Sequence, residues 1–187
     1  MDTTLFLGPP LGETILLEDG EGAVTRRTCT AISEEGVYSI EERTRFLTGN
    51  VTEENIAKNK LSEKVVRIIR GEEDLVNNYT LQAKDGKIIL HNTTFDKTDI
   101  MLDFTSRKWV IYGRSTHGKI KMECRIVREK EDFIRGKKRK LIYVEMYSKL
   151  NNEPFVDAYT IASGLGIIYS ESVSYGKTFV LYSLKDK

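Results

Sequence analysis

The sequence predicts an all-β fold: a single curved antiparallel sheet, or a half-barrel or sandwich, with one short helix. Residues that favour pleated sheet, namely Ile, Val, Thr, Tyr, Phe and Trp, number 63 among the 187 residues, whereas alanine occurs only 6 times. Short runs of these residues follow one another almost from end to end, separated by turn residues. The chain has no internal repeat, low-complexity tract or long linker, so residues 1–187 are expected to form one domain.

The first part of the chain predicts three hairpins. The clearest signal is Asp85-Gly86, because an Asp-Gly pair between two β-rich runs favours a tight two-residue turn. Gly36 marks a second turn, and residues 105–107 mark a third. The hairpins pair residues 24–32 with 37–46, 75–83 with 87–91, and 100–104 with 108–112.

The last third of the chain predicts five further strands. Polar and apolar residues alternate along these runs, as expected where one face of a sheet is buried. The strand residues Ile142, Val144 and Met146 form a core face, as do Ile120, Met122, Cys124 and Ile126 on the preceding strand. The expected strands are 119–128, 141–150, 155–162, 164–170 and 178–184.

One short helix is expected from Thr52 to about Leu61. The threonine offers a capping hydroxyl, and acidic residues follow it in the first turn. The β-branched run from Val65 to Arg70 predicts a return to strand.

Charge and hydropathy exclude several classes of protein. Lys and Arg number 29 and Asp and Glu 28, so the net charge of +1 does not favour nucleic acid or an anionic membrane as a partner. No apolar run approaches the roughly 18 residues of a spanning helix, so no transmembrane segment is expected. The first ten residues lack the features of a signal peptide. Two localisations stay open: cytoplasmic, or cell envelope or periplasm if Met1 replaces a removed export signal.

The sequence contains no recognisable catalytic or cofactor motif. Its two histidines, His91 and His117, are isolated from each other and from the cysteines. Cys29 and Cys124 lack zinc-ligand spacing and are either two buried thiols or one long-range disulfide. We therefore expect no enzymatic activity, no metal and no cofactor.

A dense basic run is the most distinctive local feature. Residues 119–140 carry ten basic and four acidic side chains, whereas residues 13–54 carry ten acidic and four basic. The run occupies an expected turn, which favours a solvated hairpin tip that discourages edge aggregation. The other reading is a partner-binding surface for nucleic acid or an acidic protein. Its residues are Arg135, Lys137, Lys138, Arg139 and Lys140.

Both ends of the chain resemble uncharacterised bacterial envelope lipoprotein-type β domains. Residues 157–171 are similar to the strand that closes many such domains, in which a tyrosine and a small residue precede a Gly-apolar-Gly phrase. Residues 5–14 are similar to the apolar-proline-leucine-glycine phrase at their start. The resemblance implies a LolA-like architecture, a strongly curved antiparallel sheet whose concave side can hold an apolar ligand. The chain lacks the tryptophan usual after Gly12 and any lipidated cysteine, which leaves export and anchoring open.

Two functional hypotheses follow. The first is a non-enzymatic domain associated with the cell envelope, with an apolar ligand on the concave face or an envelope protein as partner. The second is a cytosolic module that binds through the basic run. A cavity in the first case would be lined by Ile142, Val144, Met146, Tyr159, Ile161, Ile167 and Tyr169, and the alternative for the same residues is a filled core.

Overall fold

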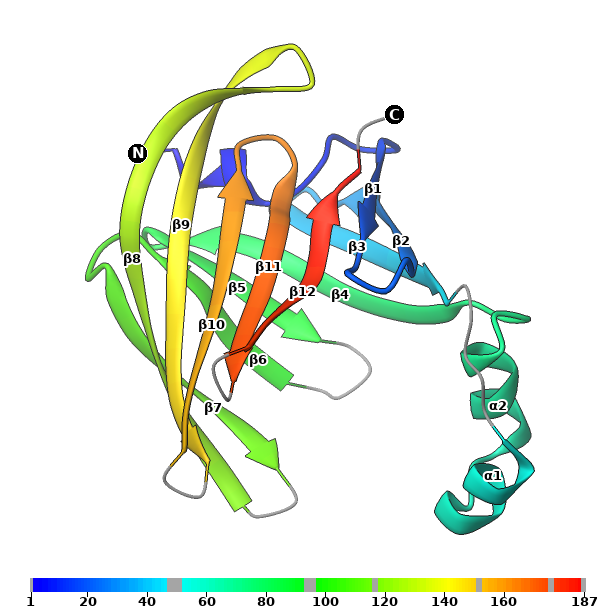
Figure 1. Ribbon diagram of the computed structural model, residues 1–187. Helices are drawn as coiled ribbons and strands as arrows, with labels where there is room; N and C mark the ends of the chain where they lie inside the picture. Colours follow the sequence, from blue (N-terminus) through cyan, green and yellow to red (C-terminus); the bar gives the residue numbers. More distant parts are fainter. Residues whose placement is uncertain are drawn as a thin grey trace.

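The chain folds as an all-β, nearly closed barrel-like sheet (Figure 1). A computed structural model describes residues 2–46, 52–92, 97–115, 118–150, 153–174 and 177–185. Twelve strands form one antiparallel sheet in the order β6-β5-β4-β3-β2-β1-β12-β11-β10-β9-β8-β7. The strands are β1 Thr14–Glu18, β2 Val24–Ile32, β3 Val37–Arg45, β4 Leu75–Lys84, β5 Lys87–Asn92, β6 Lys97–Asp103, β7 Lys108–Ser115, β8 Gly118–Ile134, β9 Lys137–Leu150, β10 Glu153–Ala162, β11 Gly166–Ser174 and β12 Lys177–Leu184.

Two six-stranded halves face each other across the core. The link between them is short, because β1 pairs with β12 only at Leu17↔Leu184 and Glu18↔Ser183. In Figure 1, β2 to β4 cross behind β10 to β12. The 3-10 turn η1 (Thr3–Phe6) adds Phe6 to the core between the halves. The fully or nearly fully buried members of this core include Phe6, Leu7, Cys29, Ile40, Ile88, Leu102, Ile142, Val144 and Ile161.

Side chains join the two ends of the sheet, β6 and β7. The indole Nε1 of Trp109 on β7 donates a hydrogen bond to Ile100 O on β6 at 2.8 Å. From the opposite wall, the hydroxyl of Tyr159 on β10 donates to Met101 O at 2.6 Å. The barrel is thus closed here by buried polar side chains instead of a backbone ladder.

Two of the three predicted hairpins are confirmed, 24–32 with 37–46 and 75–83 with 87–91. The third is wrong: residues 100–104 and 108–112 correspond to β6 and β7, which follow each other through a turn but stand at opposite ends of the sheet order, because β6 pairs with β5 and β7 pairs with β8. Asp85 (φ 50°) and Gly86 (φ 72°) both have the positive φ of a type I′ turn, whose twist matches the flanking strands. Arg135 and Gly136 repeat this conformation, with φ of 51° and 70°, between the long strands β8 and β9.

The prediction of a strand from Val65 to Arg70 is wrong, and the chain has two short helices instead of one. The helices are α1 (Glu53–Asn59) and α2 (Glu63–Ile69). The hydroxyl of Ser62 accepts a hydrogen bond from Val65 N at 3.4 Å, and Gly71, with φ of 71°, follows the last turn. This cap at each end outweighs the β propensity of the valines and isoleucines between them.

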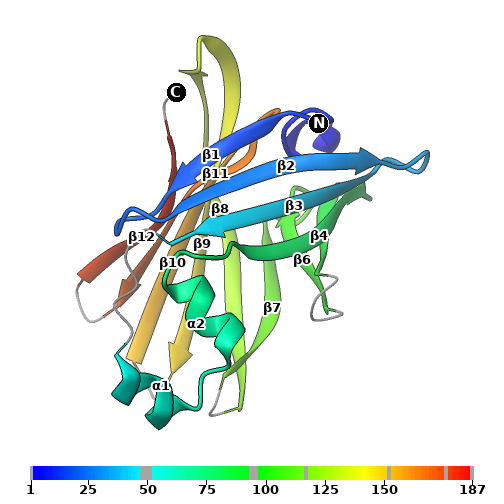
Figure 2. The same ribbon diagram turned by 90° about the vertical axis from the view of Figure 1, so that its right-hand side faces the viewer.

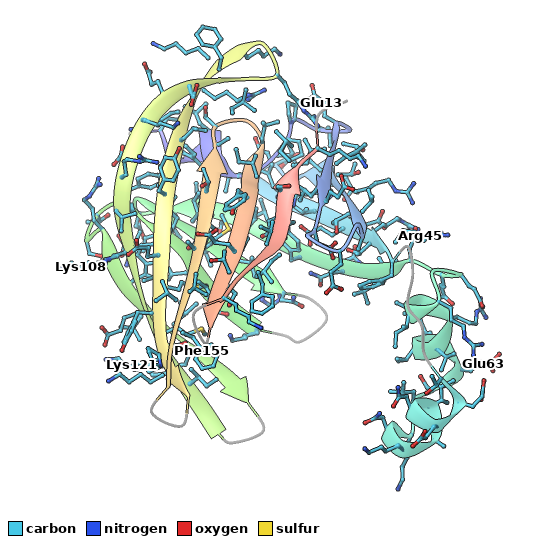
Figure 3. All side chains as sticks on the ribbon, in the orientation of Figure 1. Glu13, Arg45, Glu63, Lys108, Lys121 and Phe155 are labelled. Carbon is cyan, nitrogen blue, oxygen red and sulfur yellow. The ribbon has the colours of Figure 1, made fainter. Side chains whose placement is uncertain are left out.

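Both helices project from the barrel at the lower right of Figure 1, and in Figure 2 they face the viewer. The sheet continues across this excursion as if uninterrupted, because Thr44 on β3 pairs directly with Leu75 on β4. Arg45, labelled in Figure 3, fastens the base: its side chain binds the carboxylate of Asp74 and donates to Gly71 O at 3.0 Å.

A second apolar cluster lies on the opposite face of β9 from the main core. Ile142 belongs to the main core, whereas its neighbour Leu141 belongs to the second cluster. Ile134, near the tip of the β8–β9 hairpin, packs against this second cluster. The hairpin is therefore held to the body of the protein.

The two cysteines are free thiols in the main core, so the disulfide alternative does not apply in this structure. Burial raises the pKa of Cys124 to about 12 and also raises that of Cys29. Both thiols are consequently protonated at neutral pH. Because the thiolate is the reactive form of cysteine, these two thiols are not nucleophiles there.

Removing the Tyr159 hydroxyl tests how strongly its hydrogen bond to Met101 O holds β6 to the opposite wall of the barrel. Tyr159→Phe leaves the buried Met101 carbonyl without its donor, so the free energy of unfolding should fall by about 1–3 kcal/mol in urea titrations. The control is Tyr112→Phe on an exposed tyrosine, for which a change below about 0.5 kcal/mol is expected. Equal effects of the two substitutions would contradict this account.

The β6–β7 turn predicts a pH dependence of stability. Burial favours neutral Asp103, but amide hydrogen bonds from Ser106 (3.0 Å) and Thr105 (2.8 Å), together with Lys87, lower its pKa below the ordinary 3.8. A lowered folded-state pKa adds stability above the unfolded pKa, and this stability is lost as the pH falls through the folded value. Urea titrations between pH 5 and pH 2 should show this loss, and Asp103→Asn should flatten it.

Candidate functional site

The concave face of the sheet is filled by packed side chains. Among the predicted lining residues, Ile142, Val144, Tyr159 and Ile161 are buried in the main core. Met146 and Ile167 are partly buried and pack against it. The structure thus brings six of the seven residues together around one core.

The seventh residue, Tyr169, lies on the other face of the sheet because of a β-bulge. Ile161 pairs with Ile167, but Thr160 pairs with Tyr169, which leaves Ile168 as an extra residue on β11. Residues that pair across strands share a face, so Tyr169 follows Thr160 to the side opposite Ile161. There its hydroxyl donates to Glu171 Oε2 at 2.6 Å, in an outer groove of about 760 Å³.

A cavity of about 160 Å³, on the inside of the barrel but partly open to solvent, lies beside a buried ion pair. It lies between Leu7 and Gly8, the strands β2 to β6, and β11 and β12. This volume has room for several waters or one small molecule. The lining combines apolar side chains with charged, amide and phenol groups: Leu7, Gly8, Arg27, Glu42, Asn77, Tyr79, Leu81, Leu90, Asn92, Met101, Gly166, Ile167 and Tyr182.

Arg27 is the centre of this site. It is only 4% exposed, and its Nε lies 2.6 Å from Glu42 Oε1. Its Nη1 donates to Ile167 O across the barrel, and its guanidinium lies 5.6 Å from the ring centroid of Tyr182. The hydroxyl of Tyr79 donates to the same Glu42 oxygen at 3.0 Å.

Strand alternation explains why these polar groups point inward. Arg27 stands two residues before the core residue Cys29 on β2, and Glu42 stands two residues after Ile40 on β3. The site was not predicted from the sequence, although Arg27 and Glu42 stand at core-face positions of two predicted strands that form one hairpin. Two opposite charges at matching positions of one hairpin also satisfy each other, since Arg27 and Glu42 are cross-strand partners.

The electrostatics of the site keep the Arg27 guanidinium charged. Burial disfavours the charged form, but the Glu42 carboxylate beside it reverses that effect and raises the pKa of Arg27. Burial also raises the pKa of Tyr79, against the opposing effect of Arg27, so its hydroxyl keeps the proton that it donates to Glu42. The site is therefore neutral in total, with opposite charges held side by side.

Amide groups stand beside the pair in the same cavity. Asn92 Nδ2 donates to Asn77 Oδ1 at 3.4 Å between β5 and β4. A site with carboxylate, amide and phenol groups offers both donors and acceptors, which suits a small neutral polar molecule.

The basic run lies at the tip of the β8–β9 hairpin, and its two arginines point back toward the body. Arg135 Nη2 donates to Lys185 O at 2.8 Å, and Arg139 Nη1 donates to Ser163 O. Each arginine thus supports the fold at this tip.

The lysines of the run are arranged differently. Lys138 pairs with Glu131 at 2.5 Å, and Lys140 pairs with Glu129 at 2.7 Å. Lys137 and Lys138 are exposed. Binding of a partner through this run stays a prediction.

Other candidate chemistry is sparse in the described part of the chain. The described residues contain no cluster of three or more His, Cys, Asp or Glu side chains that could hold a metal ion. His91 on β5 contacts the hydroxyl of Thr98 at 2.9 Å, and His117 lies outside the described residues. None of the helices that the structure describes has the length and hydropathy needed to cross a bilayer.

The comparison with known proteins gives two structural likenesses. No protein-family model and no curated protein matches the chain. A candidate lipoprotein from Parabacteroides distasonis ATCC 8503 is similar with a TM-score of 0.54 and 7% identity, over 99% of this chain and 100% of that one. A candidate exported protein with a YmcC-like fold from Bacteroides fragilis NCTC 9343 has a TM-score of 0.47 and 9% identity, over 97% of this chain and 99% of that one. The first likeness shows a shared fold and does not specifically show a LolA-like architecture.

A double-mutant cycle measures the buried pair. Arg27→Met leaves Glu42 without its partner and should lower the free energy of unfolding by about 3–5 kcal/mol. Adding Glu42→Gln removes the stranded charge, so the double variant should be more stable than the sum of the two single effects predicts. Additive effects in urea titrations would show that the two groups do not interact.

The basic-run hypothesis has its own test. Lys137→Glu with Lys138→Glu changes two exposed side chains and leaves both supporting arginines in place. If the run binds polyanions, this variant should lose salt-dependent retention on heparin. Unchanged retention would remove the hypothesis, and Lys58→Glu with Lys64→Glu, at exposed lysines of α1 and α2, is a control of equal charge elsewhere on the surface.

Proposed function

We propose that this protein is a non-enzymatic binding domain of the bacterial cell envelope that holds a small polar molecule beside Arg27 and Glu42. The observation that carries the proposal is a charged pair placed on the core face of the sheet, next to an interior cavity. The proposal replaces a large apolar ligand with a small polar one, because packed side chains occupy the concave face.

The energetics of the pair support a role other than stability. Burial of an ion pair is often no more favourable than well-packed apolar residues of similar volume. We infer that Arg27 and Glu42 orient a bound molecule. Asn77 and Asn92 would supply amide contacts, and Leu90 and Met101 would cover its apolar side.

The absence of enzymatic activity is part of the proposal. The two thiols are buried and protonated, and the hydroxyl of Tyr79 is committed to Glu42. The ionised groups of the cavity are thus used to hold each other, which suits binding better than proton transfer.

The proposed location outside the cytoplasm rests on the structural likeness. The similar proteins are a candidate lipoprotein and a candidate exported protein, and the two ends of the sequence resemble envelope lipoprotein-type domains. An envelope domain with an interior polar site would sample small molecules outside the cytoplasmic membrane.

A cavity-filling variant tests the proposal with defined probes, acetamide and erythritol. Saturable shifts of the Asn77 and Asn92 side-chain amide signals are expected on titration of at least one probe into the labelled protein. Leu90→Trp fills the cavity and should abolish these shifts, whereas Leu181→Trp, at a residue that is 48% exposed, should preserve them. The proposal fails if neither probe gives a saturable shift and native mass spectrometry of the protein from its own cells shows only the bare chain.

A further inference from the structure

The strand β7 has a free edge. It pairs with β8 on one side and stands at the end of the sheet order, as β6 does at the other end. Figures 1 and 2 show that β6 and β7 separate as they leave their shared turn. Beyond the Trp109 contact, the described part of the chain therefore provides no strand that pairs with this edge.

The hydrogen-bond phase identifies which backbone groups face outward. Ile126 N donates to Arg107 O at 3.0 Å, so the bonded pairs of this ladder involve residues of odd number on β7. Val110 and Tyr112 consequently direct their N–H and C=O groups away from β8. Ser106 Oγ donates to Lys108 O, as expected if the carbonyl of this even-numbered residue also points away from β8.

The edge of β6 is covered and that of β7 is not. The side chains of Trp109 and Tyr159 donate hydrogen bonds to the carbonyls of Ile100 and Met101 on β6. Residues 109–113 contain neither proline nor a charged residue. Prolines and charged residues commonly protect an exposed strand edge from pairing with another strand. An unprotected edge of this kind favours the addition of another strand.

The outer face of β7 offers apolar contact for an added strand. Tyr112 is 57% exposed and Val110 is 39% exposed. Val110 lines a neighbouring hollow of about 520 Å³ together with Tyr147 and Val156, and Arg125 and Glu145 contribute polar groups to it. Side chains that alternate along an added strand could contact this surface.

We propose that the β7 edge binds an extended segment of a partner protein, with an apolar centre and acidic residues at its ends. Two basic residues, Lys108 and Arg114, bracket the apolar centre of β7 in the sequence. Lys108 is exposed and lies on the outside of the barrel (Figure 3). Acidic ends on the added strand would stand opposite these charges.

Charge disfavours one pairing of two copies of this chain at the edge. An antiparallel β7–β7 pair centred on Ile111 would place Lys108 opposite Arg114 at both ends. Like charges directly opposite each other destabilise a sheet. An added strand with acidic ends would instead place opposite charges at both positions.

The test uses the full chain and a labelled synthetic peptide of eight residues, the length of β7, with valine and threonine alternating between glutamates at the ends. Fluorescence anisotropy should show saturable binding. Val110→Pro removes an outward N–H without removing a bond to β8, and should weaken binding at least about tenfold, whereas Val110→Thr should retain it. Circular dichroism and thermal unfolding verify that both variants are folded.

Two peptide controls keep the test independent of any variant. Two further peptides carry methyl groups on alternate backbone nitrogens, one at the odd positions and one at the even positions. One of the two should bind at least about tenfold more weakly than the unmethylated peptide, because its methyl groups replace the N–H groups that face β7. A peptide with lysine ends should also bind more weakly. Absence of binding, equal binding by Val110→Pro, or equal binding of the lysine peptide would overturn the proposal. A dimer in light scattering that Val110→Pro dissolves would also overturn it, by assigning the edge to a second copy.

Discussion

The single sheet of this protein curls so that its two halves bury one face against each other, and this curling brings its two end strands together. The ends β6 and β7 are consecutive in the chain but not paired as strands. The indole of Trp109 joins β7 to β6 by donating to a carbonyl of β6, and the hydroxyl of Tyr159 ties the same strand to β10 on the opposite wall. Closure by side chains lets the two halves pack against a common core while the far parts of β6 and β7 diverge.

Much of the fold could be predicted because strand alternation and turn chemistry are local. Asp85-Gly86 specifies its turn without help from the rest of the chain, and the hairpin follows. The helix α2 was missed because Val65 and its neighbours have β propensity, while Ser62 and Gly71 at the boundaries decide the outcome. Boundary residues act through single hydrogen bonds, and the average strand propensity of residues 65–70 does not include that contribution.

The candidate site was harder to predict for two physical reasons. Alternation assigned Tyr169 to the core, but one extra residue, Ile168, reverses the face of everything beyond it on β11. The polar centre went unnoticed because Arg27 and Glu42 look like ordinary surface charges when each strand is considered alone. Their meaning appears only when Cys29 and Ile40, two positions away, are known to be buried.

The helical excursion between β3 and β4 leaves the sheet and returns to the next rung of the same ladder, with Arg45 and Asp74 holding its base. None of the residues of α1 is buried, and Val66 is the buried residue of α2. Folding of the barrel thus places little demand on the composition of this branch. Over evolutionary time it is free to lengthen, shrink or be exchanged for another module, and an engineer could graft a foreign domain at the same point.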